Sequence, residues 1–253
     1  MSDLSQSSFR NRLFTTMSPD DFSLLQPHLE SIELPVKHVL VEIDAPIAHV
    51  CFLETGLASV VAESSDEESI EIGHVGYEGM TGYAVVLGVV DNDHNKTFMQ
   101  AEGSGHLVAT TALREAMAAS PSLQALMMRY LYSCQVQVAH TALANGRYNM
   151  NERLARWLLM CHDRLEGDEI PMTHEFLSLM LGVRRSGVTN EIHILEGIGV
   201  IKATRGNLRV VDRVKLEEVA GGCYGLAERE YDRLIAPLPR RNASGLSIVR
   251  NRT

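Results

Sequence analysis

The 253-residue sequence has few cysteines, a small share of aromatic residues and no long apolar run. Its four cysteines lie far apart, and no two of them are spaced as CxxC. This argues against a zinc knuckle and a compact disulfide framework, and it fits a reducing cytoplasm. No apolar stretch approaches the roughly 20 residues that span a membrane, and the N-terminal residues lack the charged-then-apolar pattern of a signal peptide. We therefore expect a cytoplasmic protein.

The sequence motifs of common enzymes are also missing. It contains no Gly-x-Ser-x-Gly elbow, no phosphate-binding loop and no HExxH helix. Carboxylates are abundant, but the acidic run at residues 66–68 lies in a turn-like segment, where solvated charge is the ordinary explanation. We therefore predict no catalytic residues and do not expect an enzyme.

What is present, between Thr173 and Ile201, is a pair of short helical patterns separated by a turn. Thr173 is a natural N-cap for the first helix, and Gly182 supplies the turn because it lacks a Cβ. The expected buried positions are Phe176, Leu177, Met180, Leu181, Val188, Ile192 and Leu195. A polar, arginine-led opening of the second helix suits a reader of the DNA major groove. The predicted base-reading residues are Arg184, Arg185, Ser186, Thr189 and Asn190.

A hairpin is predicted directly after this helix-turn-helix. Two β-rich runs within residues 200–212 flank the turn residues Arg205, Gly206 and Asn207. Such a hairpin would form the wing of a winged helix. It would place basic side chains against DNA phosphates. The predicted backbone-contacting residues are Thr173, Lys202, Arg205 and Arg209. The alternative explanation is a solvated charged surface on a small helical domain.

The net charge of −9 is unevenly divided. Residues 1–150 carry 7 basic against 18 acidic side chains, whereas residues 151–253 carry 16 against 14. The basic excess therefore coincides with the predicted DNA reader. Because an excess of two neutralises few phosphates, the position of the charges must matter more than their total.

The first part of the chain has a different pattern. Residues 9–30 look helical, and Ser18 followed by Pro19 marks a helix start. Short β-like runs separated by glycines and Asn/Asp clusters then continue from Ile32 to Leu107. Many short strands at regular spacing predict a two-layered jelly roll.

A long helix is predicted from about residue 122 to 146, after Ser120 and Pro121. Its apolar residues recur at intervals of three and four, which suits packing against its own domain or against a second copy. The predicted dimerisation residues are Leu123, Leu126, Met127, Tyr130, Leu131, Cys134 and Val138. A hinge at residues 147–151, a helix at about 152–166 and an amphipathic helix at residues 224–235 complete the predicted elements.

This order of elements, together with THEFLSLMLGVRRSGVTNEIHILEGIGVI, resembles the cyclic-AMP receptor protein/Fnr (Crp/Fnr) family of bacterial transcription regulators. The resemblance covers nearly all of residues 9–220, strongly in the quoted segment and weakly before it. It implies an α+β fold: a cyclic-nucleotide-binding-like double-stranded β-helix (jelly roll) at 1–120, a dimerisation helix and hinge at 121–148, and a winged helix-turn-helix at 149–220. A C-terminal helix and flexible tail would occupy 221–253.

The resemblance also implies a homodimer that binds a palindromic site, with half-sites about 34 Å apart. RNA polymerase is a possible further partner, and whether target genes are activated or repressed stays open. Arg185, Ser186 and Asn190 occupy the family's base-reading positions. Relatives often have glutamate at the second and arginine at the third, so the recognised sequence need not be the family's commonest one.

The sensory half departs from the cyclic-nucleotide-binding relatives. Their Gly-Glu pair is replaced by Gly79-Met80-Thr81-Gly82, and Asn95-Lys96-Thr97 stands where an arginine is expected. Lysine lacks the planar guanidinium fork that grips a phosphate, so cyclic AMP and cyclic GMP are not expected. A different small ligand, or none, is open. Its tentative pocket residues are Gly79, Met80, Thr81, Gly82, Lys96 and Thr97.

Other cofactors of the family need particular ligand residues, and the sequence shows whether these are present. No cysteine precedes Cys51, which excludes an N-terminal iron–sulfur cluster of the Fnr kind. His74 with Cys51 is the one tempting haem pair, and His94 lies in an Asn/Asp-rich segment, but structural and solvated roles explain both histidines. We predict no metal and no cofactor. The alternative function is a small-ligand- or metal-sensing module with a regulatory role that does not depend on DNA binding.

Overall fold

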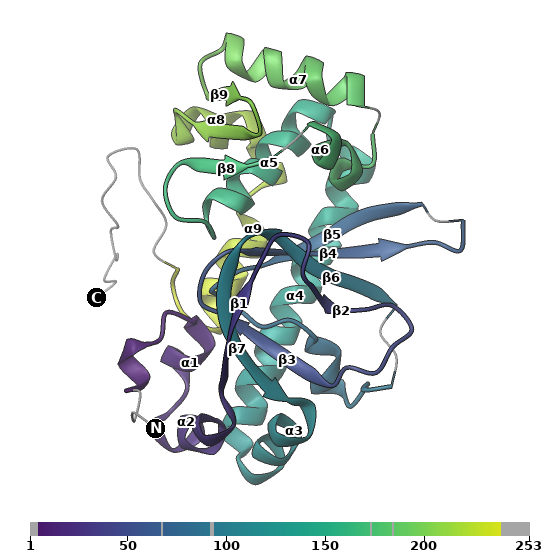
Figure 1. Cartoon of the computed structure of the whole chain (residues 1–253). Helices are drawn as coiled ribbons and strands as arrows, with labels where there is room; N and C mark the ends of the chain where they lie inside the picture. Colours follow the sequence, from purple (N-terminus) through teal and green to yellow (C-terminus); the bar gives the residue numbers. More distant parts are fainter. Residues whose placement is uncertain (1–4, 67, 92–93, 173, 184, 239–253) are drawn as a thin grey trace.

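The computed structural model describes residues 5–66, 68–91, 94–172, 174–183 and 185–238. Figure 1 shows a jelly roll, a long helix running behind it and a winged helix above it. The predicted α+β architecture is therefore confirmed. None of the helices in these ranges is long and apolar enough to cross a membrane.

Within residues 5–28, two short helices and two 3-10 turns precede the jelly roll. Ser18 accepts a hydrogen bond from the Asp21 N–H at 3.1 Å, and Pro19 is the first helical residue, so the predicted helix start is confirmed. Asn11 caps the other helix by accepting from the Leu13 and Phe14 N–H groups. The elements are a 3-10 turn (Gln6–Ser8), α1 (Arg12–Thr16), α2 (Pro19–Leu25) and a second 3-10 turn (Gln26–His28).

The jelly roll consists of two antiparallel sheets, ordered β1-β7-β3 and β2-β6-β4-β5. Strands β1 and β7 are hard to recognise in the sequence, because β1 is mostly exposed and β7 begins with glycines instead of an apolar run. A Cβ at Gly103 would lie 2.2 Å from the Thr55 carbonyl oxygen, so this close crossing requires glycine. The strands are β1 (Glu30–Leu34), β2 (Val39–Val41), β3 (His49–Leu53), β4 (Leu57–Glu63), β5 (Ser69–Val75), β6 (Asn95–Ala101) and β7 (Gly103–Ala109).

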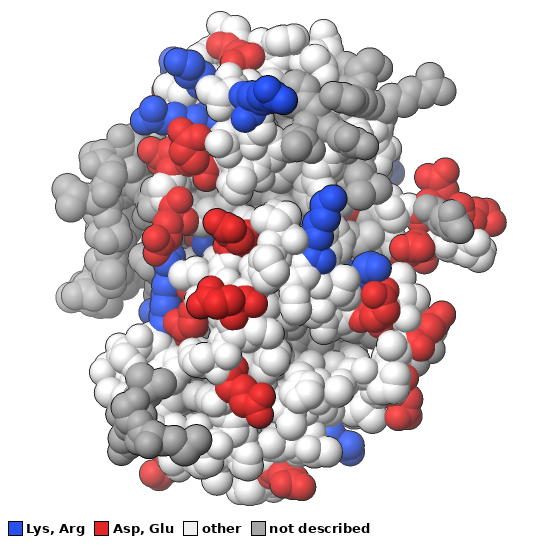
Figure 2. All heavy atoms as spheres, in the orientation of Figure 1, with Lys and Arg blue, Asp and Glu red and all other residues white. Residues whose placement is uncertain are grey.

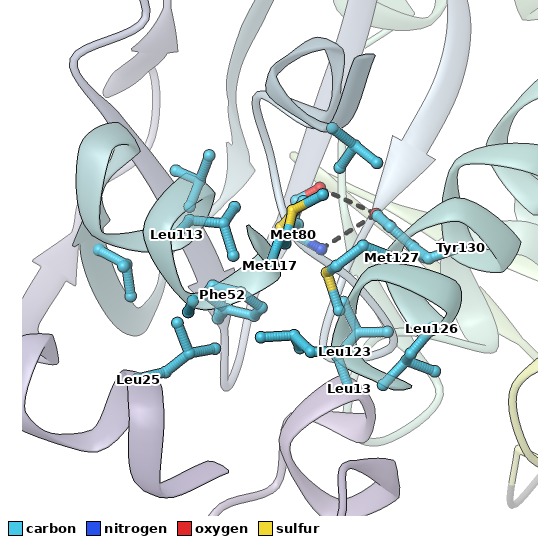
Figure 3. Close-up of a cluster of buried hydrophobic side chains, with 14 of the residues drawn as sticks. Leu13, Leu25, Phe52, Met80, Leu113, Met117, Leu123, Leu126, Met127 and Tyr130 are labelled. Carbon is cyan, nitrogen blue, oxygen red and sulfur yellow. Dashed lines mark hydrogen bonds between the residues drawn. The ribbon is translucent and has the colours of Figure 1, made fainter. Parts of the chain in front are cut away.

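Helix α3 (Thr110–Ala119) lies at the lower end of the jelly roll in Figure 1, and α4 (Pro121–Arg147) runs behind it. Ser120 caps α4, whose bounds lie within one residue of the prediction. Figure 3 shows side chains of α3 and α4 meeting Phe52 and Met80 in one apolar core. Tyr130 fixes α4 to the sheet, because its hydroxyl donates to the Met80 carbonyl at 2.8 Å and accepts from the Met80 N–H at 3.0 Å.

The winged helix begins at Asn149, which forms a capping box with Glu152. Its first helix ends at His162, four residues earlier than predicted, because the Arg164 and Leu165 N–H groups both donate to the Cys161 carbonyl and the chain then turns. The remaining elements are α5 (Met150–His162), β8 (Glu169–Pro171), α6 (His174–Leu181), α7 (Arg185–Gly197), β9 (Ile201–Thr204), β10 (Asn207–Val210), α8 (Arg213–Ala220), a 3-10 turn (Gly221–Cys223) and α9 (Leu226–Leu234).

The winged helix and the jelly roll share one apolar cluster. Leu57, Val61 and Ala101 of the sheet pack with the buried side chains of α5 to α8. Trp157 of α5 donates its indole N–H to Glu71 Oε1 of β5 at 2.6 Å. The two parts are thus in direct contact, instead of being joined only through α4.

We expect the Asn11→Ala variant to lose about 2–4 kcal/mol of unfolding free energy, because it removes an N-cap and two buried hydrogen bonds. The Asn11 amide is fully buried and donates to the Leu53 and Gly79 carbonyls, both at 2.8 Å. Urea denaturation measures the change. Asn145→Ala on the exposed side of α4 is the control and should stay within about 0.5 kcal/mol. A loss below about 1 kcal/mol for Asn11→Ala would contradict this expectation.

Candidate nucleic-acid interface

Helices α6 and α7 are joined by the predicted turn. Gly182 has φ of +62°, a conformation that favours glycine, and the Val183 N–H donates to the Ser178 carbonyl at 3.0 Å. Six predicted positions are fully or almost fully buried, and Phe176 is partly buried. The six are Leu177, Met180, Leu181, Val188, Ile192 and Leu195. The apolar spacing of the sequence therefore predicted the inner face of both helices correctly.

The predicted base-reading residues belong to the beginning of α7. Arg185 and Ser186 occupy its first turn, Thr189 is half-buried and Asn190 is exposed. Thr173 and Arg184 lie outside the described residues. The buried Val188 and Ile192 anchor α7 from below, which leaves the Asn190 side outward. The exposed Asn190 is accessible to a nucleic acid, whereas contacts of α7 with bases are a proposal.

The predicted hairpin is present as β9 and β10. The two strands are antiparallel, and the Arg205-Gly206 turn joins them with Gly206 at φ of +80°. Lys202, Arg205 and Arg209 are all exposed, and no ion pair between these three and an acidic side chain occurs within the described residues. Lys202 stands directly opposite Arg209, with Glu169 of β8 on the other side of Arg209. Like charges in opposite positions repel, so an anion over this edge would stabilise it.

The acidic and basic side chains are unevenly distributed on the face shown in Figure 2. Basic groups gather at the top over the winged helix with a few acidic ones among them, and acidic groups predominate over the jelly roll and the β4–β5 hairpin. This agrees with the charge division along the sequence. The excess of positive charge therefore lies at the winged-helix end of this face.

Residues 152–219 match the family model described as the Crp-like helix-turn-helix domain. The match includes α6, the turn at Gly182, α7 and both strands of the wing. This part of the chain is a Crp-like helix-turn-helix domain. No curated protein sequence matches the chain.

Solved structures share the arrangement of the whole chain. FixK2 from Bradyrhizobium japonicum is similar with a TM-score of 0.66 and 17% identity, over 77% of this chain and 98% of FixK2. A CRP-family transcriptional regulator from Thermus thermophilus gives 0.62 and 18%, over 76% and 97%. The c-di-GMP responsive global regulator CLP of Xanthomonas campestris gives 0.61 and 15%, over 76% and 99%. The predicted Crp/Fnr resemblance is thus confirmed at the level of the fold.

Two small cavities beside α4 are lined by residues other than the six tentative pocket residues. Met80, Thr81 and Thr97 are buried among protein atoms, and Gly79 leaves room only for the Tyr130 hydroxyl. Gly82 faces Ile47 and Val50 at the opposite end of the loop. Lys96 forms an ion pair with Glu42 at 3.0 Å, and this hydrogen bond lowers the pKa of Glu42.

The candidate metal and haem residues lie apart from one another, each beside protein groups. His74 Nε2 lies 2.7 Å from Glu71 Oε1, and its ring meets Trp157 edge-on. Burial raises the pKa of the Cys51 thiol to about 12. His94 Nδ1 lies 3.5 Å from Asp44 in an exposed pair. Within the described ranges, no three His, Cys, Asp or Glu side chains are grouped in a way that could hold a metal ion.

A buried ion pair that sequence reasoning missed joins the Crp-like domain to the jelly roll. Arg164 Nε donates to Glu78 Oε1 at 2.6 Å, and both side chains are at most 7% exposed. Burial lowers the pKa of Arg164, but the charges of Glu78 and Asp163 outweigh it and the net direction is upward. The available signal was the run WLLMCHDRL, in which charged residues directly follow a continuous apolar stretch.

A second buried group lies at the end of α5. Arg213 donates to Asp163 Oδ1 at 2.8 Å and to His162 Nδ1 at 2.9 Å. Because guanidinium only donates, His162 Nδ1 is the acceptor, and its Nε2 carries the proton toward Asp168 at 3.0 Å. Burial lowers the pKa of His162, which agrees with this neutral form.

We expect cyclic AMP at about 1 mM to leave the melting temperature unchanged. A ligand that binds the folded protein and is present at a hundred times its Kd would instead raise the unfolding free energy by about 2.7 kcal/mol. The reason is that Tyr130 already occupies the Met80 N–H and Glu42 already pairs with Lys96. Scanning calorimetry measures the shift, with a cyclic-AMP-dependent regulator as the positive control. A saturable rise in melting temperature would show that the nucleotide binds.

Proposed function

We propose that the protein is a DNA-binding transcription regulator of the Crp/Fnr type that acts as a homodimer. The observation that carries this proposal is the Crp-like helix-turn-helix domain at residues 152–219, with the outer side of α7 and the wing cations exposed. The apolar cluster beneath α7 holds the helix rigidly. Rigid support of a reading helix favours selectivity among base sequences.

The start of α7 is the proposed base-reading element. Arg185 is the first candidate, because a guanidinium can donate to guanine O6 and N7 together. Asn190 is exposed further along the same helix and suits adenine. Arg184, Ser186 and Thr189 complete the proposed set.

Phosphate contacts are proposed for the wing and for Thr173. Lys202 and Arg209 stand side by side on the exposed wing face, and Arg205 occupies its tip. A phosphate between Lys202 and Arg209 would relieve their repulsion. Such contacts position the protein on the duplex without reading sequence.

The homodimer is proposed to form along a different side of α4 from the one that the sequence indicated. Of the seven predicted dimerisation residues, Leu123, Leu126, Met127, Tyr130 and Leu131 are buried in the core of their own chain. Cys134 and Val138 are half-buried. A partner could reach the five buried residues only if the jelly roll opened, so we move the interface to the exposed side.

That exposed side carries an outer stripe, which consists of Ala125, Met128, Tyr132, Gln135, Ala139 and Leu143. Met128, Tyr132 and Leu143 are 45%, 50% and 44% exposed, so three large apolar side chains of one helix face solvent in the single chain. Spacings of three and four residues place the stripe along one seam, as in a two-stranded coiled coil. The stripe contains no charged residue, which also favours a second α4 as its partner.

An effector for the jelly roll is not specified by its residues, and we assign the protein no catalytic activity. RNA polymerase is a proposed further partner because a Crp/Fnr-type regulator must act on transcription. The domain division at residues 120, 148 and 220 is likewise a proposal. The shared apolar cluster means that these parts fold against one another.

The Arg185→Ala and Arg209→Ala variants should weaken DNA binding in different ways. Arg185→Ala should cost about 1–3 kcal/mol on a palindrome selected from a random library and relax one base position. Arg209→Ala should weaken all sequences alike and lower the salt slope by about one. Quantitative mobility shifts at several salt concentrations measure both effects.

Arg114→Ala on the exposed side of α3 is the control, because it removes an equal charge far from the wing. Unchanged affinity and selectivity in Arg185→Ala would mean that α7 does not read bases. Failure of the unaltered protein to select any palindrome would contradict the proposed function itself.

The Met128→Glu and Tyr132→Glu variants should produce monomers, because two carboxylates would face each other across the seam. Sedimentation should then give 28.0 kDa instead of twice this mass. Leu87→Glu is the matched control, because Leu87 is an exposed apolar residue outside α4. Persistence of the dimer in both variants would place the interface elsewhere.

A further inference from the structure

The chain continues past the Crp-like domain and returns to the jelly roll. The family match ends at residue 219, and the segment 221–238 follows it. Here this segment is called the strap. It comprises a 3-10 turn, α9 and an extended end, and Figure 1 shows α9 lying beside α4 below the winged helix. The predicted amphipathic helix is therefore present, but its apolar side is occupied within the same chain.

The beginning of the strap is joined to the winged helix. The Tyr224 hydroxyl donates to Asp163 Oδ2 at 2.5 Å and accepts from Arg213 Nη2 at 2.9 Å. Cys223 is buried, and Glu228 caps α9 by accepting from the Gly225 N–H at 3.0 Å. This end therefore moves with α5 and α8.

The other end of the strap is joined to the jelly roll and α4. Tyr231 is 6% exposed within the jelly-roll core, and its hydroxyl donates to the Glu78 carbonyl at 2.6 Å. Arg129 of α4 donates to the Leu234 carbonyl at 3.0 Å, and Arg12 of α1 donates to the Pro237 carbonyl at 3.1 Å. Leu226 at the start of α9, by contrast, is 44% exposed.

Beneath the strap, the winged helix meets the jelly roll at a polar junction. A cavity of about 20 Å³ lies there, large enough for a single water molecule. It is lined by His74 and Glu78 of the jelly roll, Asp163 and Arg164 after α5, and Glu228 and Tyr231 of α9. The Arg164–Glu78 ion pair crosses this junction directly. The strap thus covers the place where a change in the angle between the two parts would have to begin.

We propose that residues 221–238 are an intramolecular strap that holds the winged helix in one orientation against the jelly roll. Because Tyr224 is fixed to the winged helix and Tyr231 to the jelly roll, α7 can swing only after α9 leaves α4. The strap is then a regulatory device: a signal acting at the jelly roll or α4 must release Tyr231 before the reader can move. Its regulatory meaning rests on the proposed DNA-binding function, whereas its mechanical action does not.

The single tryptophan of the chain offers a direct test. Trp157 is 3% exposed and sits at the contact between α5 and β5. Loosening of the winged helix should expose its indole to a small quencher. The full-length variants are Tyr231→Ala, which removes the anchor, and Tyr231→Phe and Tyr224→Phe, which each remove only a hydroxyl. Leu226→Ala, an exposed position on the same helix, is the matched control.

We expect acrylamide quenching of Trp157 to rise about threefold in Tyr231→Ala and to a smaller extent in both Phe variants, with far-UV circular dichroism unchanged. Leu226→Ala should behave like the unaltered protein. If Tyr231→Ala is unfolded by circular dichroism, the two Phe variants decide. Unchanged quenching in the folded anchor variants, or an equal rise in Leu226→Ala, would overturn the proposal.

A DNA-binding assay tests the regulatory role of the strap. Its probes are the selected palindrome and a single half-site. A loosened winged helix must be re-aligned on each half-site, so Tyr231→Phe should bind the palindrome about tenfold more weakly while half-site affinity stays the same. Unchanged or increased palindrome affinity, despite greater quenching, would overturn the claim that the strap positions the reader. Absence of DNA binding by the unaltered protein would refute only the proposed function, because the Trp157 measurement needs no DNA.

Discussion

The relation between the two halves of the molecule depends on the buried carboxylate of Glu78. One oxygen accepts from Arg164 at 2.6 Å, and the other accepts from the Gly76 N–H at 3.0 Å. The cost of removing both charges from water offsets much of their attraction. The pair therefore adds little net stability. It does fix how the winged helix is positioned against the jelly roll, because either charge alone in this site would be strongly unfavourable. An apolar contact of the same area would tolerate sliding, whereas this ion pair does not.

Three sides of helix α4 have different surroundings. Its inner side completes the apolar core of the jelly roll, a second side receives α9, and the outer stripe is left to solvent in the single chain. The Gln137 side chain bonds the N–H and C=O groups of His74 on β5, so α4 contacts the sheet through polar groups as well. One helix is common to the core, the strap and the proposed dimer seam. A shift of α4 would therefore change the contacts of all three.

The elements defined by local sequence could be predicted well. Gly182, the apolar spacing around it and the Arg205-Gly206 turn fixed the helix-turn-helix and the wing, because these features depend on neighbouring residues. The side of α4 that meets a partner could not be chosen, because apolar residues occur around most of its circumference. Periodicity shows that a residue is buried but not by which chain. The structure resolves this for Leu126, which is buried in its own chain, and Tyr132, which is exposed.

Contacts between residues distant in the sequence were not predictable. Arg164 and Glu78 are 86 positions apart, and Tyr231 and Glu78 are 153 apart. Each residue taken alone looks like an ordinary solvated or amphipathic side chain. Strand β7 was missed for a related reason: its glycines are required by the Thr55 carbonyl from another part of the chain, a constraint absent from its own sequence.

The loop at residues 76–82 is where these long-range contacts converge. Met80 is bonded to Tyr130 of α4 through both its N–H and its carbonyl, Glu78 is paired with Arg164 after α5, and the Glu78 carbonyl receives the Tyr231 hydroxyl from α9. Gly79 permits the tyrosine contact, because a Cβ there would stand 2.1 Å from the Tyr130 hydroxyl oxygen. A loop held from three directions cannot shift without breaking a bond to at least one of α4, α5 or α9. Through Arg164, Glu78 links this loop directly to the winged helix, even though no residue of the loop lies in the Crp-like domain.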